Sequence, residues 1–250
     1  MPPLIHATHA RAVVLASAAA LVVGVGACSE VTVPNYNAPS TEQLVTTPTA
    51  ATVNTTVAGL LVGMRGSAGT WAVTLGALGR EIYNLDAAEP RNVNAILIGP
   101  LEPGGFGTDM GWTATYRQLR TAVTILEAVE KVPNYTDEQR AAVRGFVKTI
   151  MAQEYVNQLR VRDTFGIVVD VNPDPSVLGD FVSRDDGYAR AAALFDEGRA
   201  DLAAGGAAFP FQLTSGFAGF NTPATFVRVN RALKARMEVY RGRWEDALQA

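Results

Sequence analysis

Apolar side chains recur every three or four residues through the stretch 109–166, and this period is typical of amphipathic α-helices. In the first half of the stretch, the residues that keep the period are Trp112, Tyr116, Leu119, Val123 and Leu126. A helix through them leaves most of its charged side chains on the opposite side. Pro133 and Asn134 then end this helix, because proline lacks the amide hydrogen that a helix interior needs.

A second helix is predicted to begin at Thr136, whose hydroxyl can cap the first turn while Gln139 reaches back, as in a capping box. Its apolar stripe comprises Val143, Phe146, Val147, Ile150, Tyr155 and Leu159. Gly166 can take the left-handed conformation that follows a helix. Because the loop between the two helices is short, they should form an antiparallel hairpin, and such hairpins bury their stripes by stacking on further ones.

The helical pattern returns in the rest of the chain. Further helices are predicted from Thr47, from about Gly69 to Asp86, from Ser183, from Thr222 and from Trp244. In the helix over 69–86, the regularly spaced apolar residues are Trp71, Leu75, Leu78, Ile82 and Leu85. Thr47 and Thr222 each precede a proline, which suits the first position of a helix. The sequence therefore predicts an all-α fold of stacked helix pairs.

Two long connections interrupt this pattern. Residues 87–108 lose all periodicity and are rich in proline and glycine, and residues 167–182 are irregular as well. Loops of this length inside a compact domain are uncommon and are often functional. Within the first connection, the apolar run Ala95–Ile98 is either a short strand or a plug that fills a gap.

The first residues are predicted to be a lipoprotein leader. Arg11 is the only charge before an apolar run at 12–25, which is too short to span a bilayer as a folded anchor. The segment Val25–Cys28 resembles a bacterial lipobox, in which the cysteine is lipidated and becomes the mature N-terminus. An ordinary signal peptide with an incidental cysteine, or a short membrane anchor, is the alternative. The resulting divisions are a signal peptide at 1–27, a tether at 28–40 and a helical domain at 41–250.

Composition narrows the possible functions. The formal net charge is −3, from 21 basic and 24 acidic residues, and no basic run appears, so no nucleic-acid partner is expected. Both histidines, His6 and His9, lie in the leader, and Cys28 is the single cysteine. The chain after the leader therefore lacks the groups for Ser-His-Asp or Cys-His catalysis and for an ordinary zinc site.

Two motifs mimic ligand sites but depart from their patterns. Asp170–Asp174 opens like a calcium loop, but Pro175 replaces the required glycine and Phe181 replaces the bidentate glutamate. The Gly104–Gly107 run has the wrong spacing for a dinucleotide fingerprint. No pair of acidic residues is placed across a cleft, as glycoside hydrolysis requires. We therefore expect that the chain is not an enzyme and that it has no catalytic residues, no metal and no cofactor.

Segments along most of the chain carry a family resemblance. In the central stretch they are Tyr116, Arg120, Ala122, Ile125, Leu126, the run Val143–Tyr155 and Asp163–Gly166. With the loop prolines Pro173 and Pro175 and the tether at 33–39, they resemble the SusD/RagB family of outer-membrane nutrient-binding lipoproteins. Residues 241–248 resemble the junction between tetratricopeptide repeats, which that family uses as a scaffold. The resemblance implies stacked tetratricopeptide-like helix pairs, an αα superhelix with long irregular loops.

The resemblance also implies a function and a location. A family member captures an oligosaccharide or similar nutrient at the outer membrane, where its lipid anchors it, and passes it to a TonB-dependent, SusC-like transporter. The alternative function is a lipid-anchored tetratricopeptide-type scaffold that binds protein or peptide partners. Short loops and a continuous groove would favour the scaffold, whereas the long connections favour the nutrient binder.

Ligand contacts in the family often come from the inter-helix loop, so the candidate ligand-binding residues are Arg91, Asn92, Asn94 and Phe106. Trp71, Trp112 and Tyr116 lie on apolar helix stripes and are interpreted as core residues. Family members are usually longer, so we expect the domain to continue beyond residue 250. In that case the helix from Thr222 should leave part of its apolar surface uncovered, at Phe226, Leu233 and Met237.

Overall fold

The computed structural model describes residues 41–66 and 68–250, and these are mostly helical. The signal peptide at 1–27, Cys28 and the tether at 28–40 lie outside the described residues. In chain order the elements are α2 Thr41–Thr46, α3 Ala50–Gly66, α4 Ala68–Leu78, the π-helix η1 Asn92–Leu97, α5 Trp112–Val129, α6 Asp137–Arg162, the 3-10 helix η2 Asp163–Phe165, β1 Ile167–Val168, β2 Phe181–Val182, α7 Arg184–Ala203, the 3-10 helix η3 Ser215–Phe217, α8 Pro223–Tyr240 and α9 Trp244–Gln249.

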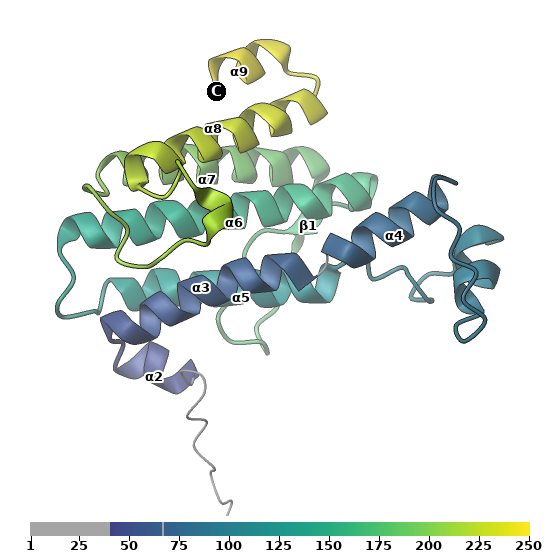
Figure 1. The fold of residues 1–250 in the computed structure, drawn as a ribbon, viewed down its shortest axis with the longest axis horizontal. Coiled ribbons are helices and arrows are strands. Elements are labelled where there is room, and N and C mark those ends of the chain that lie inside the picture. Colours follow the sequence, from purple (N-terminus) through teal and green to yellow (C-terminus); the bar gives the residue numbers. More distant parts are fainter. Residues whose placement is uncertain (1–40, 67) are drawn as a thin grey trace, which may run out of the picture. The chain divides into compact units, whose positions relative to one another are not determined.

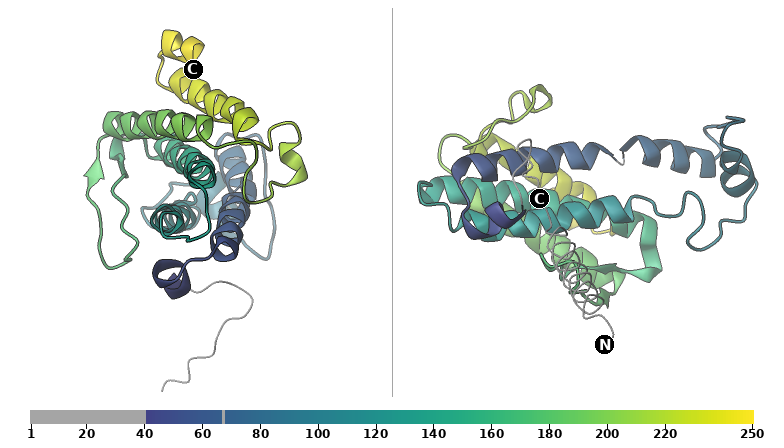
Figure 2. Two further views of the ribbon diagram at one scale, coloured as in Figure 1. Left: turned by 90° about the vertical axis from the view of Figure 1, so that its left-hand side faces the viewer. Right: turned by 90° about the horizontal axis from the view of Figure 1, so that it is seen from below.

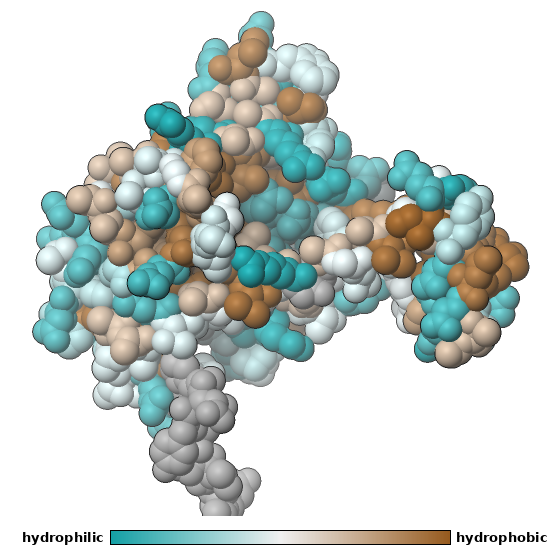
Figure 3. All heavy atoms as spheres, in the orientation of Figure 1, coloured by the Kyte–Doolittle hydropathy of each residue, from teal (hydrophilic) through white to brown (hydrophobic). Residues whose placement is uncertain are grey.

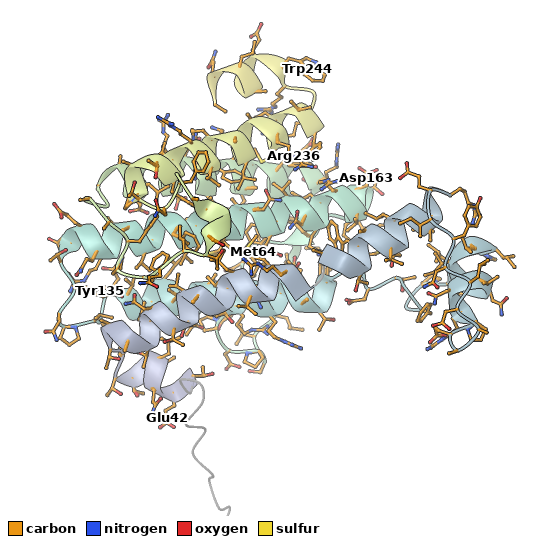
Figure 4. The ribbon with its side chains drawn as sticks, viewed as in Figure 1. Glu42, Met64, Tyr135, Asp163, Arg236 and Trp244 are labelled. Carbon is orange, nitrogen blue, oxygen red and sulfur yellow. The ribbon has the colours of Figure 1, made fainter. Side chains whose placement is uncertain are left out.

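The long helices pack in chain order, each against the next. Helix α6 packs on α5, α7 on α6 and α8 on α7, while α3 covers α5 (Figures 1 and 2). The helix pair predicted for 109–166 is α5 and α6. A hydrogen bond of 2.6 Å from the Tyr135 hydroxyl to Asn54 Oδ1 ties the loop between these two helices to α3 (Figure 4). The predicted all-α character is thus confirmed at the level of packed helices.

Most of the predicted helix starts are confirmed. Thr136 and Gln139 form the expected capping box of α6, Ser183 caps α7, and Thr222 caps α8 with Pro223 in its first turn. The predicted start of α3 was wrong. Its cap is Thr49, whose Oγ1 accepts from the Thr52 amide at 3.1 Å, rather than Thr47.

The core centres on α6, whose predicted stripe is fully confirmed as buried. Four phenylalanine rings extend it: Phe146, Phe209, Phe211 and Phe226, with centroids 5.0 Å apart for Phe146 and Phe211 and 5.1 Å for Phe146 and Phe226. The expectation for α8 was wrong at two positions. Phe226 and Met237 are both 0% exposed, because the loop 204–222 and α6 cover the first and the neighbouring helices enclose the second. Leu233 is half-buried.

Helices α6 and α7 are in close backbone contact at two glycines, Gly145 and Gly198. A Cβ atom on Gly145 would lie 2.7 Å from the Leu202 amide nitrogen and 2.8 Å from the Gly198 carbonyl oxygen. Both distances are shorter than van der Waals contact, so only glycine fits here without moving the backbone. The two glycines therefore fix how closely the largest helix pair packs.

The buried face of α5 is rotated from the predicted one. Its buried apolar residues are Leu119, Ala122, Ile125, Ala128 and Val129, whereas Trp112, Tyr116, Val123 and Leu126 are only partly buried. The rotation follows from the packing, because α3 and α6 contact α5 from two directions and the buried face lies between them.

Helix α4 is shorter than predicted. It ends at Leu78, where Gly79 and Arg80 turn the chain and Arg80 takes a left-handed φ of 62°. The stripe expected over 69–86 is therefore largely exposed, with Leu85 69% exposed, and the buried residues of α4 are Thr74 and Ala77. The strand considered for Ala95–Ile98 is also wrong, because this run lies mostly in η1, where Ile96 and Leu97 pack on Ala77. We call residues 68–107 the arm (Figure 1).

A short antiparallel ribbon was not predicted. Strands β1 and β2 pair Ile167 with Val182 and Val168 with Phe181, and the loop between them runs beside α5. We call residues 167–182 the hairpin. Among residues 41–66 and 68–250, no helix combines the length and apolarity needed to cross a membrane.

Candidate ligand-binding clefts

A cavity of about 470 Å³ lies between the outer face of α5 and the hairpin. We call it the aromatic cleft, and the aromatic, charged and amide side chains that line it are Trp112, Tyr116, Arg120, Arg162, Asp170, Asn172 and Phe181. Its volume is within the range of small-ligand sites. The positions Trp112, Tyr116 and Arg120 are each four residues apart, so they form one row along α5.

Three aromatic rings form the apolar wall of the aromatic cleft. The Trp112 and Phe181 rings are stacked, with centroids 5.6 Å apart and an angle of 5° between their planes. Tyr116 lies 4.2 Å from Trp112 at an angle of 38°. Phe181 is 63% exposed, so its ring offers a flat apolar surface to a ligand while Trp112 supports it from below. Stacked rings of this kind contribute about 0.5–1.5 kcal/mol beyond the area that they bury.

Two tyrosines hold the hairpin in place. The Tyr116 hydroxyl accepts a hydrogen bond from the Val168 amide at 2.8 Å and donates one to the Val168 carbonyl at 2.9 Å. The Tyr155 hydroxyl donates to the Val169 carbonyl at 2.8 Å. Burial raises the pKa of Tyr155 to about 12 and also raises that of Tyr116, so both hydroxyls stay protonated and continue to donate at neutral pH.

Two arginines provide the positive charge of the aromatic cleft. The Arg162 guanidinium lies 4.5 Å from the Trp112 ring centroid, and its Nη2 donates to the Asp109 carbonyl at 3.2 Å. Its Nε is buried and has no hydrogen-bond partner among the described residues. Arg120 Nε donates to the Asn172 carbonyl at 3.2 Å, which connects α5 to the tip of the hairpin.

A second cavity, of about 550 Å³, lies in the arm and is bordered by the segment before α5. We call it the arm cavity, and its larger lining side chains are Trp71, Thr74, Asn92, Ile96, Phe106 and Met110. The chain is strained at this border, because Met110 takes a left-handed φ of 47° before Gly111 at 76°.

The four candidate ligand-binding residues all lie in the arm, but they do not form one surface. Asn92 and Phe106 line the arm cavity. Arg91 lies over the Phe106 ring, 4.4 Å from its centroid, and forms an ion pair with Glu89. Asn94 is exposed and lines none of the cavities described here.

The interpretation of three aromatic residues as core was confirmed only in part, because Trp112 and Tyr116 pack against the core while they also border a cavity. Trp71 lines the arm cavity, while Trp112 and Tyr116 line the aromatic cleft, and all three are only partly buried. Sequence reasoning missed the aromatic cleft because the Phe181 side of it comes from the hairpin. The signal present in the sequence was the continuation of the Trp112 and Tyr116 row to Arg120, since a charged residue seldom continues a core stripe.

A buried polar cluster lies one turn away from the aromatic cleft. Thr115 Oγ1 donates to Glu154 Oε2 at 2.8 Å and accepts from Gln158 Nε2 at 3.1 Å. Burial raises the pKa of the Glu154 carboxyl, and the hydrogen bond from Thr115 lowers it by a smaller amount. This cluster faces the α5–α6 contact, so it contributes to packing rather than to the cleft surface.

The loop that mimics a calcium site is a turn. The Asp174 carboxylate accepts from the Ser176 amide at 2.8 Å and from its hydroxyl at 2.7 Å, and these bonds lower the pKa of Asp174. Within the described part of the chain, no group of three or more histidine, cysteine, aspartate or glutamate side chains is placed to hold a metal ion. The aromatic cleft combines flat apolar rings with planar hydrogen-bonding groups.

Comparison with known proteins finds no match for this chain among family models, curated proteins or solved structures.

Proposed function

We propose that this chain is a lipid-anchored outer-membrane protein that captures an oligosaccharide or a similar nutrient and passes it to a TonB-dependent, SusC-like transporter. The observation that carries the proposal is the aromatic cleft. A pyranose ring has an apolar C–H face and a rim of hydroxyl groups. Phe181 offers a flat ring for that face, while Arg120 and Asn172 offer hydrogen-bonding groups for the rim.

The arrangement of helices supports a scaffold of tetratricopeptide-like pairs. The pair α5–α6 and the pair α7–α8 follow each other in the chain and stack through α6 and α7. Helix α9 begins another unit after Gly242, which takes a left-handed φ of 70°. Repeats of this kind present their loops on one side, and in the proposal the hairpin supplies the ligand contacts.

The anchor and the location are supported by the sequence of the leader. Cys28 follows small residues and a short apolar run, and lipidation there would hold the chain at the outer membrane. The proposal includes no catalysis, since residues 29–250 contain neither histidine nor cysteine. It also includes no cofactor, no metal and no nucleic acid.

The protein partner is supported by the surface of the arm. The large apolar side chains exposed there are Val73, Leu75, Leu78, Ile82, Tyr83, Leu85, Ile98 and Leu101. Figure 3 shows apolar residues on the surface of this part of the chain. An exposed cluster of this kind is typical of surfaces that contact another protein. The same observation favours the second candidate function, a lipid-anchored scaffold that binds proteins or peptides.

Binding to a glycan array distinguishes the two functions. The purified full chain should bind a subset of oligosaccharides, and free oligosaccharide should compete for them. A scaffold would bind none and would instead retain a peptide or protein through the arm. Leu75→Glu and Ile98→Glu, both at exposed positions of the arm, should leave glycan binding unchanged and weaken co-purification with the transporter. Loss of glycan binding in these two variants would place the ligand in the arm and contradict the assignment to the aromatic cleft.

A further inference from the structure

Charge pairing separates two arginines from the other cations. Each other partly buried lysine or arginine in residues 41–66 and 68–250 forms an ion pair with a carboxylate: Arg140, Arg144, Lys148, Arg184, Arg231, Lys234 and Arg241. Arg120 and Arg162 are partly buried but have no such partner in this part of the chain. The remaining unpaired cations are exposed, where water screens them.

Both of these arginines line the aromatic cleft. A partly buried charge without a counter-ion is unfavourable, because it loses hydration and gains no Coulomb energy in return. One carboxylate, that of Asp170, lines the aromatic cleft as well, and among the described residues it forms no ion pair with Arg120 or Arg162. Asp174 lies on the same exposed loop, where hydrogen bonds from Ser176 and, to a smaller extent, the charge of Arg120 lower its pKa. The two arginines thus outnumber the one carboxylate that lines the aromatic cleft. The aromatic cleft therefore has unused capacity for an anion.

Each of the two arginines also lines a second cavity. Arg162 also lines a cavity of about 580 Å³ beside Pro103 and Phe165. Arg120 also lines one of about 390 Å³ beside Arg117 and Pro173. The aromatic cleft thus shares Arg162 with the first of these cavities and Arg120 with the second. A ligand long enough to reach from the aromatic cleft toward either of these cavities would meet a guanidinium.

We propose that the aromatic cleft binds a linear acidic oligosaccharide, with one sugar ring stacked on Phe181 and anionic groups of neighbouring sugars on Arg120 and Arg162. This inference rests on the proposed function, the capture of an oligosaccharide. A guanidinium presents two parallel N–H donors that match a carboxylate or a sulfate ester. An exposed aromatic ring in the same cleft as two cations suits a chain that carries both flat sugar faces and repeated negative charges.

The proposal is tested by isothermal titration calorimetry on the purified full chain with matched pairs of probes. One pair is tetragalacturonate and its methyl ester, and the other is a sulfated galactan tetrasaccharide and its desulfated form. A glycan array of neutral, uronate-bearing and sulfated oligosaccharides extends the comparison to other linkages. A tetraglutamate peptide tests whether charge alone is sufficient. The pair that shows the larger difference identifies carboxylate or sulfate as the anionic group.

The acidic member of a pair should bind at least about tenfold more tightly than its neutral counterpart, and the difference should shrink at high salt. Arg120→Gln and Arg162→Gln should each remove most of this difference, so that the acidic and neutral forms bind the variant with affinities that differ much less than tenfold. Arg199→Gln, at an exposed position of α7, is the matched control and should change nothing. If Arg162→Gln fails to fold, Arg120→Gln and the salt dependence of the unsubstituted chain still decide the question.

Three results would overturn the inference in different ways. Equal binding of acidic and neutral oligosaccharides would contradict a preference for anionic ligands but would leave the proposed capture of an oligosaccharide in place. If tetraglutamate bound as tightly as the acidic oligosaccharides, the inferred ligand would be an acidic peptide rather than a glycan. No binding of any oligosaccharide on the array would overturn both this inference and the proposed function.

Discussion

One hydroxyl group, on Tyr116, satisfies both backbone hydrogen-bonding groups of Val168. It accepts from the Val168 amide at 2.8 Å and donates to its carbonyl at 2.9 Å. The same ring packs against Trp112, so a single residue fastens the hairpin to α5 and forms part of the aromatic cleft. The position of Phe181 therefore depends on Tyr116, because Phe181 pairs with Val168 across the ribbon.

Replacement of Tyr116 by phenylalanine should loosen the hairpin. The variant leaves the Val168 amide and carbonyl without partners in a partly buried place, which costs about 1–3 kcal/mol of unfolding free energy. Chemical denaturation measures the loss, and hydrogen exchange should become faster at the Val168 amide. Tyr83→Phe is the matched control, because Tyr83 is exposed and its hydroxyl has no hydrogen bond within the described part of the chain. Equal stability of the two variants would contradict this role.

Removal of the Phe181 ring should weaken ligand binding without unfolding the protein. Phe181→Ala deletes the exposed ring on which a sugar stacks, and we expect about tenfold weaker binding of the best oligosaccharide on the array. The unfolding free energy should fall by only about 0.5–1.5 kcal/mol, the contribution of the stack on Trp112, since the side chain is largely exposed. Trp244→Ala removes another exposed aromatic ring, on α9, and should bind as the unsubstituted chain does (Figure 4). Full affinity of Phe181→Ala would exclude this ring as the stacking surface.

Local signals in the sequence were sufficient for the helix starts. Thr136, Ser183 and Thr222 cap their helices through side chains within three residues, so no distant part of the fold affects them. The stripe of α6 was also predictable, because other elements surround that helix and almost any periodic apolar residue on it becomes buried. Thr49 shows the limit of such signals, since Thr47 before Pro48 carried the stronger pattern and yet is not the cap.

The aromatic cleft was not predictable from periodicity. Trp112 and Tyr116 keep the helical period, but the face of α5 that becomes buried is set by α3 and α6 together. Phe181 reaches Trp112 only because the hairpin folds back on α5, and two-residue strands leave almost no pattern in a sequence. The prediction of one helix over 69–86 failed for a different reason. Arg80 takes a left-handed φ of 62°, and a non-glycine residue gives little warning in the sequence of such a turn.

The stability of the protein should depend on pH through Glu154. Burial raises the pKa of its carboxyl above the ordinary value of 4.5, so the folded state holds the proton longer than the unfolded state. The contribution of this group to stability is therefore full below pH 4.5 and is lost as pH rises through the folded pKa. Glu154→Gln cannot ionise and keeps an oxygen acceptor for Thr115.

Denaturation of Glu154→Gln across a range of pH checks this sign. Relative to the unsubstituted chain, the variant should gain stability as pH rises above 4.5, and the difference should level off once the buried carboxylate is ionised. Glu127→Gln, on the exposed side of α5, serves as the matched control. A difference between Glu154→Gln and the unsubstituted chain that stays constant over this range would contradict the buried titration.

Replacement of Cys28 by serine should release the protein from membranes. The expectation follows from the lipobox-like segment Val25–Cys28, since a serine hydroxyl does not replace the cysteine sulfur that carries the lipid. Membrane fractionation measures the release, and mass spectrometry of the unsubstituted chain should show an acylated N-terminus. An unmodified peptide that spans Ala27 and Cys28 in the mature protein would contradict lipidation.

The last prediction concerns the contact between α6 and α7. Gly145→Ala adds a Cβ atom that would lie 2.7 Å from the Leu202 amide nitrogen and 2.8 Å from the Gly198 carbonyl oxygen. Both neighbours are backbone atoms, so they cannot turn away as a flexible side chain does, and the two helices must separate. We expect the unfolding free energy to fall by about 1–3 kcal/mol, even though alanine favours the helix itself.

Gly59→Ala is the matched control for this contact. Gly59 lies inside α3, where a Cβ atom would meet nothing within 4 Å, so the same substitution should raise the unfolding free energy by about 0.5–1 kcal/mol. The two variants should therefore shift thermal and chemical unfolding in opposite directions. If Gly145→Ala were as stable as Gly59→Ala, α6 and α7 would have to be farther apart than the two glycines place them. Neither substitution should change ligand binding in the aromatic cleft much, because the residues of the cleft lie on α5, at the end of α6 and on the hairpin, away from Gly145.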